Sequence, residues 1–99
     1  MNRFDIADMA SGGIALVLEP EAAWEDFPGY AKKWAERLGA KQVSEPVITF
    51  DECLLEVQVD GGRFWITYDD FQSSIQLEPR DKKYNDIVLS IRKRLHSVA

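Results

Sequence analysis

The chain has 99 residues, of which 45% are hydrophobic, 11% aromatic and 29% charged, and its net charge at pH 7 is −5. This length accommodates a single domain, residues 1–99, and the aromatic content argues against a disordered chain. The lone Cys53 excludes an internal disulfide and any metal site built from several thiolates.

The composition also sets expectations about location and partners. No stretch approaches the roughly 18 apolar residues of a membrane span, and Asp5 and Asp8 interrupt any secretory signal, so we expect a cytoplasmic protein with no membrane partner. Residues 42–79 contain one basic and eight acidic residues, whereas residues 80–99 contain six basic and two acidic ones. Nucleic-acid binders are basic, so an acidic chain predicts no nucleic-acid partner.

The N-terminal half predicts two strands and a helix. Alternation around Phe4 and Ile6 and the apolar run Ile14–Leu18 indicate two strands joined by a glycine turn. Apolar residues then recur every three or four positions up to Leu38, which predicts one buried helix face. The helix either begins at Pro28-Gly29, which we favour, or continues from a short turn at 21–26. The residues of that face are Trp24, Phe27, Ala31, Trp34 and Leu38.

The middle of the chain predicts an antiparallel meander over residues 53–78. Residues 40–52 contain a strand-like segment, Val47–Phe50, but no pattern that decides their structure. Alternation over residues 53–59 and 64–68 flanks Asp60-Gly61-Gly62, which predicts a hairpin with Gly61-Gly62 as its loop. That loop would pair Val57 with Ile66, Val59 with Phe64 and Leu55 with Tyr68. The third strand, around Ser74–Leu77, is expected at an edge of the sheet.

A second amphipathic helix is predicted over residues 81–97, with Asp81 as its N-cap and basic residues in its last turns, where they complement the helix dipole. Its apolar positions are Tyr84, Ile87, Val88, Ile91, Leu95 and Val98.

The order of elements, β-β-α-β-β-β-α, predicts an α+β fold with a five-stranded antiparallel sheet and two helices packed on one face. This order is similar to that of profilin-like, longin and roadblock-type domains, a similarity of architecture without a shared motif.

No residue pattern predicts catalysis, a cofactor or a metal. His96 lies three residues from the end of the chain, where a general base has no fixed position, and Cys53 falls on the apolar side of its strand. The carboxylate pairs Asp51-Glu52 and Asp69-Asp70 sit at predicted turns, where Asp bonds to its own backbone. A small metal-dependent or acid/base enzyme using these turn carboxylates remains the alternative function.

The residue that points to a function is Trp65. The predicted alternation turns it away from the core, onto a polar face shared with Gln58, Thr67 and Gln76. A tryptophan on such a face is either an anchor for binding or a side chain that packs under the N-terminal segment or a loop. We therefore expect a non-catalytic module that binds a protein partner or itself, as a homodimer, through these four residues.

Overall fold

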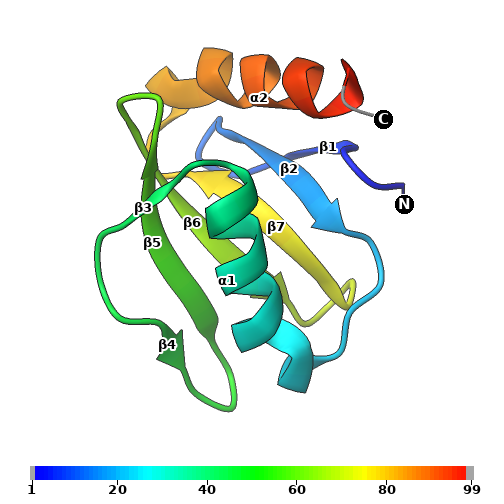
Figure 1. Cartoon of the computed structure of the whole chain (residues 1–99). Coiled ribbons are helices and arrows are strands. Elements are labelled where there is room, and N and C mark those ends of the chain that lie inside the picture. Colours follow the sequence, from blue (N-terminus) through cyan, green and yellow to red (C-terminus); the bar gives the residue numbers. More distant parts are fainter. Residues whose placement is uncertain (1, 98–99) are drawn as a thin grey trace.

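The computed structural model describes residues 2–97 and shows an α+β fold, as the sequence predicts (Figure 1). The strands are β1 (Ile6–Asp8), β2 (Ile14–Glu19), β3 (Lys41–Gln42), β4 (Val47–Ile48), β5 (Cys53–Val59), β6 (Gly62–Asp69) and β7 (Ser74–Pro79). The helices are α1 (Phe27–Arg37) and α2 (Asn85–Ser97), each preceded by a short 3-10 turn, η1 (Trp24–Asp26) and η2 (Lys82–Tyr84).

All strand pairs are antiparallel, and the sheet order is β1-β2-β7-β6-β5-β3, with β4 also paired to β5. The described residues thus form seven strands rather than five. The two additional strands, β3 and β4, have two residues each and pair with opposite halves of β5. Strand β4 lies in the segment Val47–Phe50 that the sequence marks as strand-like, whereas the two residues of β3 carry too little alternation to be recognised.

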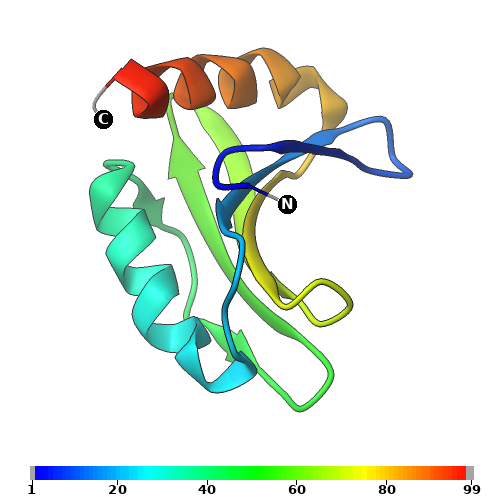
Figure 2. The same cartoon turned by 90° about the vertical axis from the view of Figure 1, so that its right-hand side faces the viewer.

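Both helices pack on the same side of the sheet, and no helix of residues 2–97 covers the other side, which we call the outer face (Figure 2). Helix α1 lies against β5 and β6, while α2 crosses the end of the sheet next to β2. One hydrophobic core joins both helices to the sheet, and its largest fully buried side chains include Trp34, Phe27 and Phe64. Among the described residues, no helix is long and apolar enough to cross a membrane.

The hairpin between β5 and β6 corrects the predicted register by two residues. Asp60 and Gly61 form its loop with φ of 51° and 84°, the positive values of a tight primed turn. Val57 therefore pairs with Phe64 rather than with Ile66. A shift of two residues leaves every side chain on its predicted face, because the side-chain repeat along a strand is two.

The reason for the wrong register is that Gly62 serves helix packing and not the turn. A Cβ on Gly62 would lie 2.9 Å from Ile87 Cδ1 and 2.9 Å from Phe64 Cε2. The absence of a side chain at this position therefore allows α2 to pack against the start of β6. Asp60 takes the turn position that the prediction had assigned to a glycine, and Asp is one of the few residues that tolerate positive φ.

The prediction that Ser74–Leu77 forms an edge strand was wrong. Strand β7 is an interior strand, because β2 pairs with its free side, Leu16 lying opposite Leu77. The ends of the sheet are instead the short strands β1 and β3. Local sequence patterns do not specify which distant strand pairs with an edge, so this pairing was not predictable from the alternation.

Helix α1 confirms the predicted buried face and its end. Phe27, Ala31, Trp34 and Leu38 are buried, and Gly39 follows the helix with φ of 64°. The two alternative starts combine: α1 begins with Pro28 in its first turn and continues directly from the 3-10 turn η1. Trp24 lies on that turn and is 40% exposed, so it does not belong to the buried face.

Helix α2 confirms the second predicted helix and its buried residues Val88, Ile91 and Leu95, whereas Tyr84 and Ile87 are half-buried and Val98 lies outside the described residues. Asp81 caps the 3-10 turn η2 that leads into α2, and its Oδ1 accepts from Lys83 N at 2.8 Å. Asn85 connects the start of the helix to the first hairpin, since its Oδ1 accepts from Ile14 N at 3.0 Å and its Nδ2 donates to the Gly12 carbonyl at 3.1 Å.

A buried carboxylate, which the sequence did not indicate, joins the N-terminal segment to β2 and α1. The pairing between β2 and β7 shifts between Val17 and Glu19, a bulge that turns Glu19 to the helix side of the sheet. Glu19 is 4% exposed and accepts from Trp34 Nε1 and from Arg3, both at 2.8 Å. Phe4 packs edge-to-face on Trp34, with 6.0 Å between ring centroids, so this segment is held on the helix side.

We predict that Glu19→Leu destabilises the fold by about 1–3 kcal/mol, because it leaves the buried indole N–H of Trp34 without an acceptor. Glu19→Gln keeps an acceptor and should cost less. Urea unfolding measures both, with the exposed Glu36→Gln as control. Equal costs for the Leu and Gln variants would contradict the role given to the indole bond.

We predict that alanine has opposite effects at two glycines. Gly62→Ala forces a methyl group against Ile87 and Phe64 and should cost about 1–3 kcal/mol. Gly29→Ala meets no atom within 4 Å, lies in helix α1 and should stabilise by about 0.5–1 kcal/mol. Thermal unfolding compares them, and a neutral Gly62→Ala would show that α2 does not pack as described.

Candidate functional site

The outer face is built by the alternating side chains of β5, β6 and β7 that point away from the core. Its residues over these three strands are Leu54, Glu56, Gln58, Arg63, Trp65, Thr67, Asp69, Ser74, Gln76 and Glu78. The residues between them on β6, Phe64 and Ile66, are fully buried in the core. The sheet therefore places Trp65 on the face that the sequence predicts.

Trp65 is half-buried and lies between two glutamates. Its cross-strand partners are Glu56 on β5 and Glu78 on β7, whereas the sequence expectation put Gln58 beside it. The N-terminal segment does not cover Trp65, because Phe4 packs on Trp34 and on His96 at the other side of the sheet.

The other three predicted site residues differ in how much surface they offer. Gln58 is half-buried and lies between Arg63 and Lys41 in the register. Thr67 is half-buried, and its Oγ1 donates to Glu78 Oε2 at 2.5 Å. Gln76 is only 5% exposed, and its amide nitrogen donates to Ser74 Oγ at 3.0 Å. Gln76 is therefore buried within the face and offers little of its side chain for contact with a partner.

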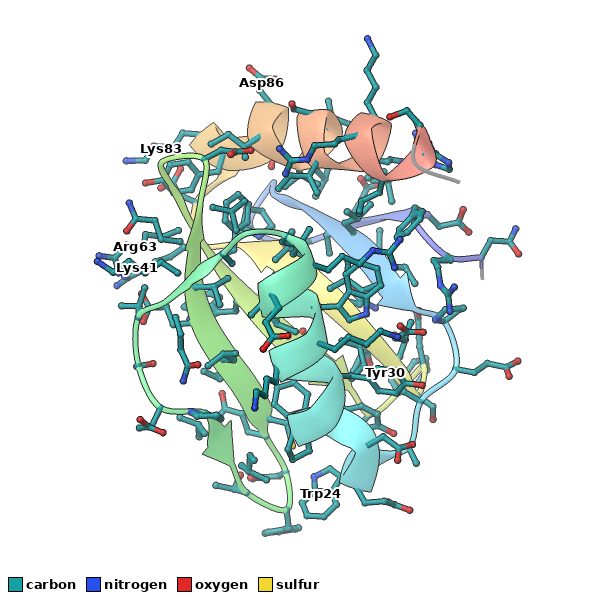
Figure 3. The ribbon with its side chains drawn as sticks, in the orientation of Figure 1. Trp24, Tyr30, Lys41, Arg63, Lys83 and Asp86 are labelled. Carbon is teal, nitrogen blue, oxygen red and sulfur yellow. The ribbon has the colours of Figure 1, made fainter. Side chains whose placement is uncertain are left out.

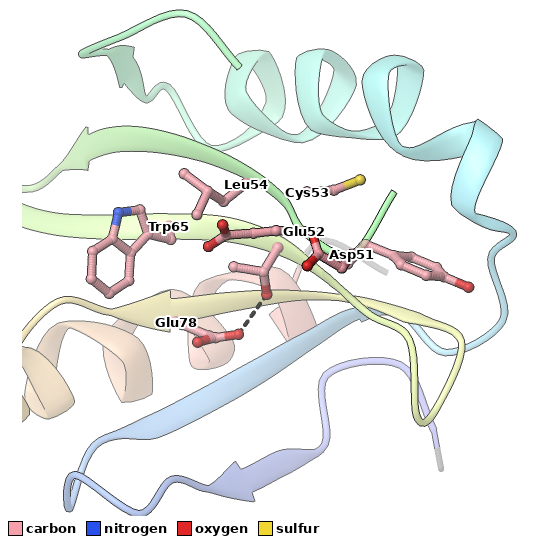
Figure 4. A pocket seen from close by; sticks show the side chains of 8 residues that line it. Asp51, Glu52, Cys53, Leu54, Trp65 and Glu78 are labelled. Carbon is pink, nitrogen blue, oxygen red and sulfur yellow. Dashed lines mark hydrogen bonds between the residues drawn. The ribbon is translucent and has the colours of Figure 1, made fainter. Parts of the chain in front are cut away.

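A hollow of about 340 Å³ opens beside Trp65 (Figure 4). The turn between β4 and β5 supplies Asp51 and Glu52 to its wall, and the outer face supplies Trp65 and Glu78. The sequence alone does not show that these carboxylates lie close together, because only strand pairing brings residue 78 next to residue 65. The lining residues are Asp51, Glu52, Cys53, Leu54, Trp65, Thr67, Tyr68 and Glu78.

The two glutamates beside Trp65 have different electrostatic surroundings. Glu56 Oε2 accepts from Arg63 at 3.0 Å and from Arg80 at 3.1 Å, so cations of the chain itself already neutralise it. Among the described residues, no Lys or Arg lies within 4.0 Å of the carboxylates of Glu78 or Glu52. The wall of the hollow therefore combines an indole with carboxylates that have no cationic partner there.

The second carboxylate pair has the turn role that the sequence indicates. Asp69 Oδ1 accepts from the backbone N–H of Phe71 at 2.9 Å and of Gln72 at 3.3 Å. In the first pair, Asp51 Oδ1 accepts from Thr49 Oγ1 at 2.9 Å. Within the part of the chain that is described, no three His, Cys, Asp or Glu side chains are grouped so that they could hold a metal ion.

Two aromatic residues that the sequence pattern does not single out are highly exposed. Phe50 is 92% exposed at the turn between β4 and β5, and Phe71 is 96% exposed at the turn between β6 and β7. Both lie next to an acidic pair within a predicted turn. This position is the feature of the sequence that indicates their exposure. The hydrogen bond from Trp24 Nε1 to the Thr49 carbonyl, 3.2 Å long, brings a third exposed aromatic to this end of the molecule.

Cys53 is 3% exposed, as expected, and its thiol points toward α1 (Figure 4). Burial raises the pKa of this thiol above its ordinary value, because a thiolate loses its hydration in the core. We predict that the native protein reacts with a disulfide reagent at pH 8 at least about tenfold more slowly than the urea-unfolded chain, since the raised pKa and burial both lower the accessible thiolate. Absorbance of the released thiol measures both rates, and equal rates would contradict the burial.

Residues 4–95 match the model of the protein family described as "Protein of unknown function (DUF3630)". Neither the curated proteins nor the solved structures contain a match to this chain. The matched region runs from the N-terminal segment that contacts Trp34 to the last buried residue of α2, and so includes the whole sheet and the hollow. The chain therefore belongs to the DUF3630 family of proteins of unknown function.

Proposed function

We propose that this chain is a non-catalytic interaction module that binds protein through its outer face, with Trp65 as the anchor. The observation that carries the proposal is the position of Trp65: half-buried, on a face without a helix, beside a hollow with carboxylates. Tryptophan is enriched among residues that dominate binding energy, because its ring supplies a large rigid contact area. Gln58 and Thr67 flank it on the same face and complete the contact surface.

The chemistry of the hollow favours a basic group on the bound protein. An indole face attracts an ammonium or guanidinium group through its quadrupole, and nearby carboxylates add charge attraction. Glu52 and Glu78 supply that charge here, without a cation of the described chain beside them. We also propose a cytoplasmic location, because the only cysteine is a buried free thiol, which suits a reducing compartment.

The alternative, a small metal-dependent or acid/base enzyme, has no observation in its favour. Asp69 is occupied by its own turn, and the carboxylates of the hollow are not grouped as metal ligands among the described residues.

We predict that Trp65→Val keeps the chain folded and abolishes its protein contact. Valine suits a strand, and removing part of a half-buried indole should cost about 1–2 kcal/mol. The contact is measured with a photo-crosslinking residue at Gln58 in the full chain, expressed in its source organism at native level. We expect a discrete protein adduct, identified by mass spectrometry, that disappears with Trp65→Val.

The matched control carries the same photo-crosslinking residue at Glu36, which is exposed on α1 at the opposite side of the sheet. Adducts at position 36 that equal those at position 58, or adducts at 58 that survive Trp65→Val, would refute the outer face as the binding surface. A loss of stability beyond about 3 kcal/mol would show instead that Trp65 belongs to the core.

A further inference from the structure

The outer face has a basic end, at the side where the β5–β6 turn lies. Lys41, Gln58 and Arg63 form one row across three strands, with Gln58 between the two cations, and Figure 3 shows Lys41 and Arg63 on the same side of the molecule. Arg80 joins them, since Arg63 and Arg80 both bind Glu56. Arg63, Arg80 and Lys83 also line a common hollow of about 280 Å³, together with Asp81 and Tyr84.

The opposite end of the same face is acidic. Asp69 ends β6, Glu52 precedes β5 on the same side of the sheet, and Asp51 and Asp70 lie in the adjoining turns. Arg63 and Asp69 are six residues apart on one strand, which is about 20 Å at ~3.3 Å per residue. Among the described residues, no ion pair links the carboxylates of this end to a Lys or Arg.

Between the two ends the face is mixed: apolar side chains lie beside Glu56 and Glu78, which flank Trp65. Trp65 and Leu54 are half-buried there, and Val43 and Val47 at the β3–β4 side are 38% and 41% exposed. The face is therefore cationic at the Arg63 end and anionic at the Glu52 and Asp69 end, with Trp65 and Leu54 between the two. A surface with this order is complementary to itself when it is turned end to end, because each charged end then meets the opposite charge.

We propose that the occupant of the outer face is a second copy of this chain. The two faces pack against each other around a twofold axis that lies between them and runs across the strands near Trp65. The Arg63 end of each copy then faces the Glu52 and Asp69 end of its partner, and the two Trp65 side chains meet close to the axis. This inference rests on the proposed function and assigns its partner.

The arrangement with the strands parallel is disfavoured, because it would place the Arg63 ends together and the Glu52 ends together. Like charges brought together at an interface cost several kcal/mol, so the charge pattern selects the antiparallel arrangement. A cation of the second copy also fits the hollow beside Trp65, which has the indole and the unpaired carboxylates that attract a guanidinium group.

The size of the surface sets the expected affinity. The accessible part covers β3 and β4, β5, β6 and, at Glu78 alone, β7, so it is at most about 19 Å wide at ~4.8 Å between strands and about 23 Å long. This is roughly half of the 800 Å² per partner that a standard stable interface buries. We therefore expect a weak dimer, because the surface lies at the small end of the range for specific complexes, and salt should weaken it further by screening the charged ends.

Charge reversal combined with mixing tests the arrangement. Arg63→Glu and Glu52→Arg should each weaken the dimer by about tenfold or more in sedimentation equilibrium, because each places like charges at both contacts. An equimolar mixture of the two variants should recover the wild-type dissociation constant to within about threefold, since both contacts of the heterodimer are again attractive. The double variant R63E/E52R should recover it as well.

The matched controls are Lys32→Glu and Glu36→Arg, which make the same charge changes at exposed positions of α1. They should leave the dissociation constant unchanged, and far-UV circular dichroism verifies that every variant is folded. A strict monomer up to near-millimolar concentration, or reversal variants whose mixture does not recover, would overturn the antiparallel dimer.

The crosslinking experiment at Gln58 separates this inference from the proposed function. An adduct between two copies of the chain supports both, whereas a Trp65-dependent adduct with a different protein keeps the interaction module and overturns the dimer. A monomer with no Trp65-dependent adduct overturns both.

Discussion

The alternation of side chains along β6 is the constraint on which the outer face depends. Phe64 and Ile66 are fully buried, and burying a side chain of this size is worth about 1.5–3 kcal/mol. Because neighbouring residues on a strand point to opposite sides, these two residues force Trp65 outward. Slipping the strand by one residue would bury Arg63 and expose Phe64, and an unpaired buried charge is too costly for such a register to compete.

The N-terminal segment determines what remains uncovered. The bulge in β2 turns Glu19 toward Trp34. Arg3 forms an ion pair with this carboxylate and therefore also lies on the helix side of the sheet. Arg92 Nε donates to the Phe4 carbonyl at 2.7 Å and ties the same segment to α2. The segment therefore fills the space at the two helices, and the outer face stays open around Trp65.

Strand pairing converts the charge distribution along the chain into a distribution across one face. Arg63 is the only basic residue in the acidic segment 42–79, and pairing places it beside Arg80 and Lys41 from other segments. The acidic residues of the turns gather at the other end of the strands. A chain whose net charge is negative thus presents both signs on the same surface, separated by Trp65 and Leu54. Electrostatic complementarity of this kind governs orientation and specificity more than total affinity.

The sequence by itself determined which residues form the core and which side of each strand they occupy. Buried residues recur with the period of their element, so the helix face at Phe27 and Trp34 and the outward position of Trp65 follow from local pattern alone. Asp60, rather than Gly62, occupies the turn, and this shifts the pairing of β5 with β6 by two residues. Each side chain still lies on its predicted face, because the side-chain repeat along a strand is two. The Asp81 and Gly39 caps are equally local and were equally predictable.

Only the tertiary structure decided which distant segments meet. The pairing of β2 with β7, the carboxylate of Glu19 beside Trp34 and the position of Glu78 beside Trp65 each join residues more than ten positions apart. No period in the sequence encodes such contacts, since they arise from closing loops and filling a common core. The hollow beside Trp65 and the two charged ends of the outer face exist only through those pairings, and for this reason the alternation revealed Trp65 but not its surroundings.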